Sequence, residues 1–166
     1  ATNRDEASAV YVSDIDKDGD LDIISGSQGD NTIIWYENNG AANSSWNSVT
    51  ISTNANATES LKIIDVDEDG DLDILAANQG SNAVDLYGNN GAANPSWTNT
   101  QLFKVMKDPQ NGDIHHLNIG DLDSDGDLDI TTSNSGLGNI SWHESNLSDL
   151  GLRNRAKVVQ DYTASN

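Results

Sequence analysis

The sequence predicts an all-β chain of three repeated units, each a four-stranded antiparallel sheet. Two observations carry this prediction. Nine-residue windows with five aspartates each recur three times in the 166 residues, and their first aspartates lie 51 and then 56 residues apart. Around every window apolar and polar residues alternate, which is the period of a half-buried strand. A repeat of roughly this length, about 40–50 residues, is typical of propellers, solenoids and arrays.

The first predicted strand of each unit ends at the acidic window, and the second begins just after the glycine of the window. A third strand follows after a short turn. The apolar pairs of the first strands are Val10/Val12, Leu61/Ile63 and Leu117/Ile119. Those of the second strands are Leu21/Ile23, Leu72/Ile74 and Leu128/Ile130, and those of the third are Ile33/Trp35, Val84/Leu86 and Ile140/Trp142.

A hairpin turn and a fourth strand complete each unit. Asn39-Gly40 and Asn90-Gly91 follow the third strands of the first two units, and Asn-Gly strongly favours a tight β-hairpin. The fourth strands are predicted at Val49/Ile51, at Leu102 and at Val158. Four strands in an antiparallel meander form the blade of a β-propeller. We therefore expect one propeller segment over 1–166, with blades over about 7–56, 57–110 and 111–162.

The acidic windows predict calcium sites. Five carboxylates in nine residues repel one another unless a cation compensates them, and oxygen ligands without His or Cys favour Ca²⁺. Gly19, Gly70 and Gly126 occupy position six, where a glycine permits the sharp turn of a metal loop. An EF-hand is excluded because position twelve holds Ser25, Ala76 or Thr132 in place of the chelating Glu.

Three Ca²⁺ ions are expected, one in each window. Positions one, three, five and nine would supply side-chain oxygens, and position seven its backbone carbonyl. The aspartates of the three predicted sites are Asp14, Asp16, Asp18, Asp20 and Asp22; Asp65, Asp67, Asp69, Asp71 and Asp73; and Asp121, Asp123, Asp125, Asp127 and Asp129.

These D-x-D-x-D-G-D-x-D windows between strands resemble the FG-GAP/VCBS calcium-binding β-propeller repeats of integrin α subunits, some fungal lectins and many secreted bacterial proteins. The resemblance covers roughly residues 7–160. Ile24-Ser-Gly-Ser and Leu75-Ala-Ala-Asn stand where the Phe-Gly and Gly-Ala-Pro segments would be, and Asn-Asn-Gly after the third strand is closer to the bacterial VCBS style. The resemblance implies structural calcium and a secreted or cell-surface protein.

Composition excludes several classes of function. The formal charge is −19, which repels nucleic acid and anionic membranes. No apolar run is long enough to span a bilayer. The chain has no Cys, so disulfides and thiolate chemistry are excluded. No nucleophile elbow, phosphate-binding loop or zinc motif is present, and no catalytic residue is predicted.

Three blades are fewer than the four to eight with which propellers close. Two hypotheses remain open. In one, the chain is a fragment of a longer protein. In the other, copies associate, for instance as a dimer that makes a six-bladed ring, which requires a closing heterologous interface.

Four tryptophans and a histidine have predicted places. Trp46 and Trp97 follow the Asn-Asn-Gly turns at matching positions and could stack on sugar rings, although packing against the blades is the alternative. Trp35 and Trp142 are expected in the core. His143 aligns with Tyr36 and Tyr87 and is expected to face solvent.

Three functions follow as hypotheses. The first is a lectin-like or adhesive recognition module, which binds carbohydrate or a protein surface without catalysis. The second is part of a carbohydrate-active enzyme, similar to the propellers of some polysaccharide lyases. The third is a structural spacer in a large adhesin.

Overall fold

The computed structural model describes residues 6–41, 45–104, 113–126, 128–135 and 138–143, and these residues form three antiparallel sheets without a helix. The first sheet contains β1 (Ala7–Ser13), β2 (Asp22–Ser27), β3 (Ile33–Asn38) and β4 (Trp46–Ser52). The second contains β5 (Thr58–Ile64), β6 (Asp73–Asn78), β7 (Ala83–Asn89) and β8 (Trp97–Lys104). The third contains β9 (Ile114–Gly120), β10 (Asp129–Asn134) and β11 (Asn139–His143).

Within each sheet the strands are ordered as they occur along the chain, so every sheet is a meander. The all-β prediction is confirmed. The strands predicted around each acidic window and at each third position are present, and so are the fourth strands of the first two sheets. The fourth strand predicted near Val158 lies outside the described residues. Among the described residues the third sheet therefore has three strands.

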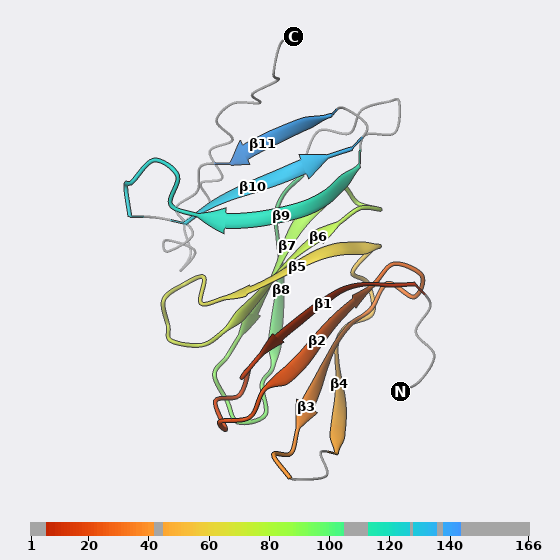
Figure 1. The fold of residues 1–166 in the computed structure, drawn as a ribbon, viewed down its shortest axis with the longest axis vertical. Helices are drawn as coiled ribbons and strands as arrows, with labels where there is room; N and C mark the ends of the chain where they lie inside the picture. The colour runs from red at the N-terminus through yellow and green to blue at the C-terminus, as the bar shows by residue number, and fades with distance from the viewer. Residues whose placement is uncertain (1–5, 42–44, 105–112, 127, 136–137, 144–166) are drawn as a thin grey trace.

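The three sheets are stacked one on another, with their first strands β1, β5 and β9 adjacent (Figure 1). Two apolar clusters fill the spaces between them. Between the first and second sheets, Trp35 and Ile24 pack with Ile63, Ile74 and Tyr87. Between the second and third sheets, a cluster that includes Leu75, Val84, Leu117 and Ile130 is buried in the same way. Burial of both faces explains why the strand β6 is buried along its whole length, and why its residues 74–77 are all apolar instead of alternating.

Side-chain amides of two asparagines tie one repeat to the next. Asn31 and Asn82 both adopt left-handed backbone angles in the turn between the second and third strands of their sheets. The Asn31 Oδ1 accepts a hydrogen bond from Ala57 N at 2.8 Å, and the Asn82 Oδ1 accepts one from Ile114 N at 2.9 Å. Each bond reaches the start of the following sheet and fixes its position in the stack.

Two predictions about individual residues are wrong, and both fail for the same reason. His143 is buried, and its Nε2 lies 3.3 Å from the Thr132 Oγ1. It shares with Tyr87 the face that packs on the preceding sheet, so it does not face solvent. Trp142 is only partly buried because it lies on the opposite face. Trp35 is fully buried, as predicted.

Candidate metal centre

The three acidic windows form the loops between the first and second strands of the sheets. The first loop lies between Ser13, where β1 ends, and Asp22, where β2 begins, and the other two loops are placed equivalently. Strands on both sides agree with the exclusion of an EF-hand, whose loop lies between helices. Position six of each loop is a glycine with φ between 95° and 98°. The left-handed conformation favours glycine there, and it turns the loop back on itself.

Hydrogen bonds from backbone amides to the aspartates give the loops one shape. In the first loop the Asp14 Oδ2 accepts from Gly19 N at 3.1 Å, and the Asp18 Oδ1 accepts from Asp20 N at 2.9 Å. The second loop repeats both bonds, from Gly70 N to Asp65 and from Asp71 N to Asp69. In both loops the carboxylates accept hydrogen bonds from backbone amides of the same loop. The repeated sequence therefore produces the same geometry in the first and second loops.

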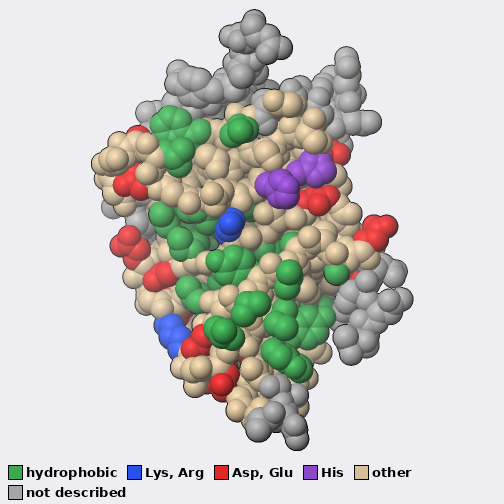
Figure 2. Space-filling model, in the orientation of Figure 1, with side chains coloured by type: hydrophobic (Ala, Val, Ile, Leu, Met, Phe, Trp, Pro, Cys, Tyr) green, Lys and Arg blue, Asp and Glu red, His purple; other side chains and the backbone are tan. Residues whose placement is uncertain are grey.

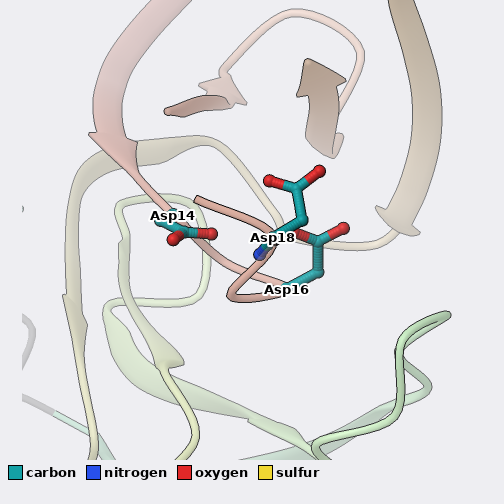
Figure 3. A group of neighbouring side chains, drawn as sticks. All are labelled: Asp14, Asp16 and Asp18. Carbon is teal, nitrogen blue, oxygen red and sulfur yellow. Dashed lines mark hydrogen bonds between the residues drawn. The ribbon is translucent and has the colours of Figure 1, made fainter. Parts of the chain in front are cut away.

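Each loop brings three carboxylates together, with one oxygen of each lying within 4.8 Å of the others. In the first loop they are Asp14, Asp16 and Asp18, which extend from a single turn of chain (Figure 3). In the other two loops the groups consist of positions one, three and nine. These groups are Asp65, Asp67 and Asp73, and Asp121, Asp123 and Asp129. Some of the predicted aspartates lie outside the group of their own loop: Asp20, Asp22, Asp69, Asp71 and Asp125. Asp127 lies outside the described residues.

Two oxygens in these groups suit a cation. The Oδ1 atoms of Asp14 and Asp65 are both buried, and neither has a hydrogen-bond partner. A buried carboxylate oxygen without a donor is costly, and a cation would remove that cost. The third loop differs, because its corresponding atom, the Asp121 Oδ1, accepts a hydrogen bond from Ser124 N at 2.7 Å.

The aspartate at position nine has a second role, as a buried bridge. The Asp22 Oδ2 accepts from Ile15 N at 3.1 Å, and its Oδ1 accepts from Asn38 N at 2.8 Å. Asp73 makes the same pair of bonds, with Val66 N at 3.0 Å and Asn89 N at 2.8 Å. The carboxylate therefore joins the acidic loop to the turn after the third strand.

That Asn-Asn-Gly turn is packed onto the acidic loop. The side-chain Nδ2 of Asn38 donates to the Leu21 carbonyl at 3.2 Å, and the Nδ2 of Asn89 donates to the Leu72 carbonyl in the same way. Gly40 has φ +64, and a Cβ at this position would overlap the carboxylate of Asp20. Gly91 is equivalent and faces Asp71. The sequence predicts the hairpin but not its support of the loop, although the repetition of Asn-Asn-Gly in register with the windows is a signal that could have found it.

In the second loop, the carboxylate at position seven contacts the neighbouring first loop. The Asp71 Oδ1 accepts from the Lys17 Nζ at 2.7 Å, and Lys17 also donates to the Gly70 carbonyl. Lys17 belongs to the first loop, so this contact joins the first and second loops. The backbone carbonyl of position seven was predicted as a ligand, and this assignment stays a prediction.

Burial, together with the neighbouring carboxylates, raises the pKa of several aspartates in the loops. Burial raises the pKa of Asp73 to about 6, with further raising contributions from Asp67 and Asp69. Burial also raises the pKa of Asp67 and of Asp16 above the ordinary value. Without a cation these groups therefore oppose the folded state when they are ionised.

We expect the metal-free protein to become more stable as the pH falls from 7 toward 4. The folded pKa of Asp73 is about 6 and the ordinary value is 3.8, so the folded state binds more protons than the unfolded state in this interval. The gain is complete below the unfolded value and is lost as the pH rises through about 6; for Asp73 it amounts to about 3 kcal/mol. Thermal unfolding in a chelator at several pH values measures it. A melting temperature that falls on acidification through this interval would contradict the expectation.

The two tryptophans with matching sequence positions have different environments. Trp97 is partly buried and packs against the cluster between the first and second sheets, whereas Trp46 is exposed.

On β8, Asn99 and Gln101 lie on the same face as Trp97, as the pairing with β7 shows. These two amides line a pocket of about 360 Å³ between the first two sheets. Its other lining residues are polar as well: Ser52, Asn54, Asn56, Ser81 and Asp85.

The comparison with protein families agrees with the repeat structure. A family model described as FG-GAP-like repeat matches twice, over residues 14–76 and 65–132. The chain belongs to the FG-GAP-like repeat family. The two matches begin at the first aspartates of the first and second windows and together extend into β10. A search of curated proteins found no match.

Membership in this family suggests a module of the extracellular, adhesion-associated type, and FG-GAP-like repeats are typically not catalytic. Among the described residues there is no helix long and apolar enough to cross a membrane.

Proposed function

We propose that this FG-GAP-like chain is a calcium-stabilised recognition module of the β-propeller type, secreted or on a cell surface, that binds carbohydrate without catalysing a reaction. The observation that carries the calcium part is the pair of buried, unpartnered carboxylate oxygens on Asp14 and Asp65. The three stacked meanders support a blade-like arrangement, and we propose the blade bounds expected from the sequence, about 7–56, 57–110 and 111–162.

Calcium fits the donor set of the loops. Ca²⁺ takes six to eight oxygen ligands in flexible geometry, and each loop offers three grouped carboxylates. Each ion would bind only the folded chain, because the groups are assembled by loop hydrogen bonds. The ions would therefore stabilise the fold and take no part in chemistry. Thermal unfolding with and without calcium tests this proposal.

Carbohydrate recognition is supported by the pocket between the first two sheets. Its lining consists of amides, hydroxyls and one carboxylate, which are the groups that hydrogen-bond sugar hydroxyls. The exposed ring of Trp46 offers an apolar face on which a sugar can stack. A polar pocket of this composition is suited to a neutral ligand, since the charge of −19 disfavours anionic polysaccharides.

We expect the double variant Asn99→Ala/Gln101→Ala to bind glycans about tenfold more weakly, since a neutral hydrogen bond contributes about 0.5–1.5 kcal/mol. A glycan array in calcium identifies the ligand, and calorimetry then measures its affinity. Thr98→Ala is the matched control, because Thr98 is exposed on the same strand but lies on the other face.

Separate outcomes decide the parts of this proposal. Unchanged affinity in a Trp46→Ala/Trp97→Ala variant excludes stacking by these rings. Binding to no glycan excludes carbohydrate recognition and leaves a protein surface or a structural spacer. A lyase would release unsaturated products that absorb in the ultraviolet, so a spectrophotometric screen separates the enzyme hypothesis from recognition.

A further inference from the structure

The first and third sheets each have one outer face that no described sheet covers. The same positions on the neighbouring sheets are buried in the interfaces between sheets. The positions four and two residues before each window lie on the face toward the preceding sheet. In the second sheet they hold Leu61 and Ile63, which are 6% and 8% exposed. In the first sheet they hold Val10 and Val12, which are 69% and 53% exposed. Figure 2 shows hydrophobic side chains gathered in the region of β1 and β2.

In the third sheet, the exposed face is the opposite one, which in the first two sheets packs on the following sheet. The position nineteen residues after the first aspartate holds Ile33 and Val84 in the first two sheets, and both are fully buried against the following sheet. In the third sheet it holds Ile140, which is 68% exposed. Trp142, two residues later and on the same face, is only partly buried.

We propose that these two end faces bind each other between two copies of the chain, with β1 of one copy nearest β9 and β10 of its partner, as β5 lies against β1 and β2 within the chain. Ile140 on β11 belongs to the same end face of the third sheet. The chain already makes this type of contact twice within itself, where the face of Leu61 covers that of Ile33 and the face of Leu117 covers that of Val84. A second copy therefore presents a face that matches each exposed end. Contiguous apolar surface is typical of association sites.

The interface is heterologous, since different faces meet, and each association leaves one free face of each kind unless a ring closes. It is weaker than the internal interfaces for two reasons. Thr131 stands in the third sheet where Ile24 and Leu75 stand in the others. Two chains of charge −19 also repel each other. Association is therefore expected to increase with protein concentration, with ionic strength, which screens the repulsion, and with calcium.

Two single-face variants test the proposal by complementation. Val10→Asp/Val12→Asp blocks the face of β1, and Ile140→Asp blocks the face of β11. Each variant alone is expected to be monomeric by light scattering and sedimentation. An equimolar mixture is expected to form a dimer that grows no further, because each pair has one intact face of each kind and the dimer uses both. Thr98→Asp is the matched control on the middle sheet and is expected to associate like the unaltered chain.

Every outcome decides the proposal. It is overturned if the unaltered chain stays monomeric in calcium at high salt, if either variant still associates alone, or if two folded variants fail to pair. Circular dichroism and a melting curve establish folding. If a charged variant is unfolded, Val10→Ser/Val12→Ser and Ile140→Ser replace the pair, because serine at an exposed position introduces no charge.

Discussion

In a chelator, the melting temperature is expected to fall by about 10 °C or more relative to saturating calcium. A ligand that binds only the folded state adds about 2.7 kcal/mol at a concentration 100 times its dissociation constant. In a chain of this size, 1 kcal/mol corresponds to about 2–4 °C. Extracellular calcium modules bind at about 10⁻⁴–10⁻³ M, so about 10–100 mM calcium is needed to reach that ratio at each site. Scanning calorimetry of the same sample before and after chelation measures the difference.

The effect is expected to be unequal among the loops. Asp16→Asn and Asp67→Asn each remove a charge from a group with an unpartnered oxygen, and should reduce the calcium-dependent shift. Asp123→Asn should reduce it less, because Asp121 already accepts a bond from Ser124. Glu6→Gln neutralises an exposed carboxylate outside the loops and serves as the control. Identical melting curves in calcium and in chelator would defeat the metal hypothesis.

The strands and loops could be predicted because their signals are local. Val10 and Val12 alternate with Tyr11 and Ser13 in the manner of a strand, although Ala9 and Tyr11 form the face that packs against the core, and Gly19 marks the turn of its own window. Asn39-Gly40 marks the hairpin between β3 and β4, although the connection has seven residues and is longer than the tight turn expected. None of these features depends on what lies across the interface, and the structure contains all of them.

The placement of side chains on the two faces of each sheet could not be predicted in the same way. His143 and Trp142 are neighbours on β11. The alternation of apolar and polar residues predicted the tryptophan in the core and the histidine at the surface. Both faces of a stacked sheet bury apolar groups, so period two does not reveal which face is covered. That depends on whether a neighbouring sheet is present, and the third sheet has one described neighbour.

The role of the ninth aspartate was missed for a different reason. Asp22 and Asp73 look like any other carboxylate of their windows, and the sequence assigns all of them to a cation. Their main contacts include an amide sixteen residues further on, in the Asn-Asn-Gly turn. A long-range hydrogen bond of this kind has no local sequence pattern, although the matching repetition of the two segments is consistent with it.

Near pH 4, Asp73→Ala is expected to be the most destabilising single substitution in the second loop, by about 2–6 kcal/mol. The substitution leaves the amides of Val66 and Asn89 without their acceptor, and an unsatisfied buried donor costs about 1–3 kcal/mol. Urea unfolding in a chelator measures the loss without any contribution from calcium. Asp69→Ala is the matched control, because Asp69 is exposed in the same loop and accepts a single amide bond.

The pH dependence separates the bridging role of Asp73 from its charge. At pH 7 the ionised carboxylate is both a hydrogen-bond acceptor and a poorly solvated charge, so its removal loses the first effect and relieves the second. Near pH 4, where burial has left Asp73 protonated, only the bridge is lost, and the cost of Asp73→Ala is expected to be larger. Asp22→Ala tests the same bridge in the first loop. A substitution cost no greater than that of Asp69→Ala at either pH would show that the loop and the Asn-Asn-Gly turn are held together without the bridge.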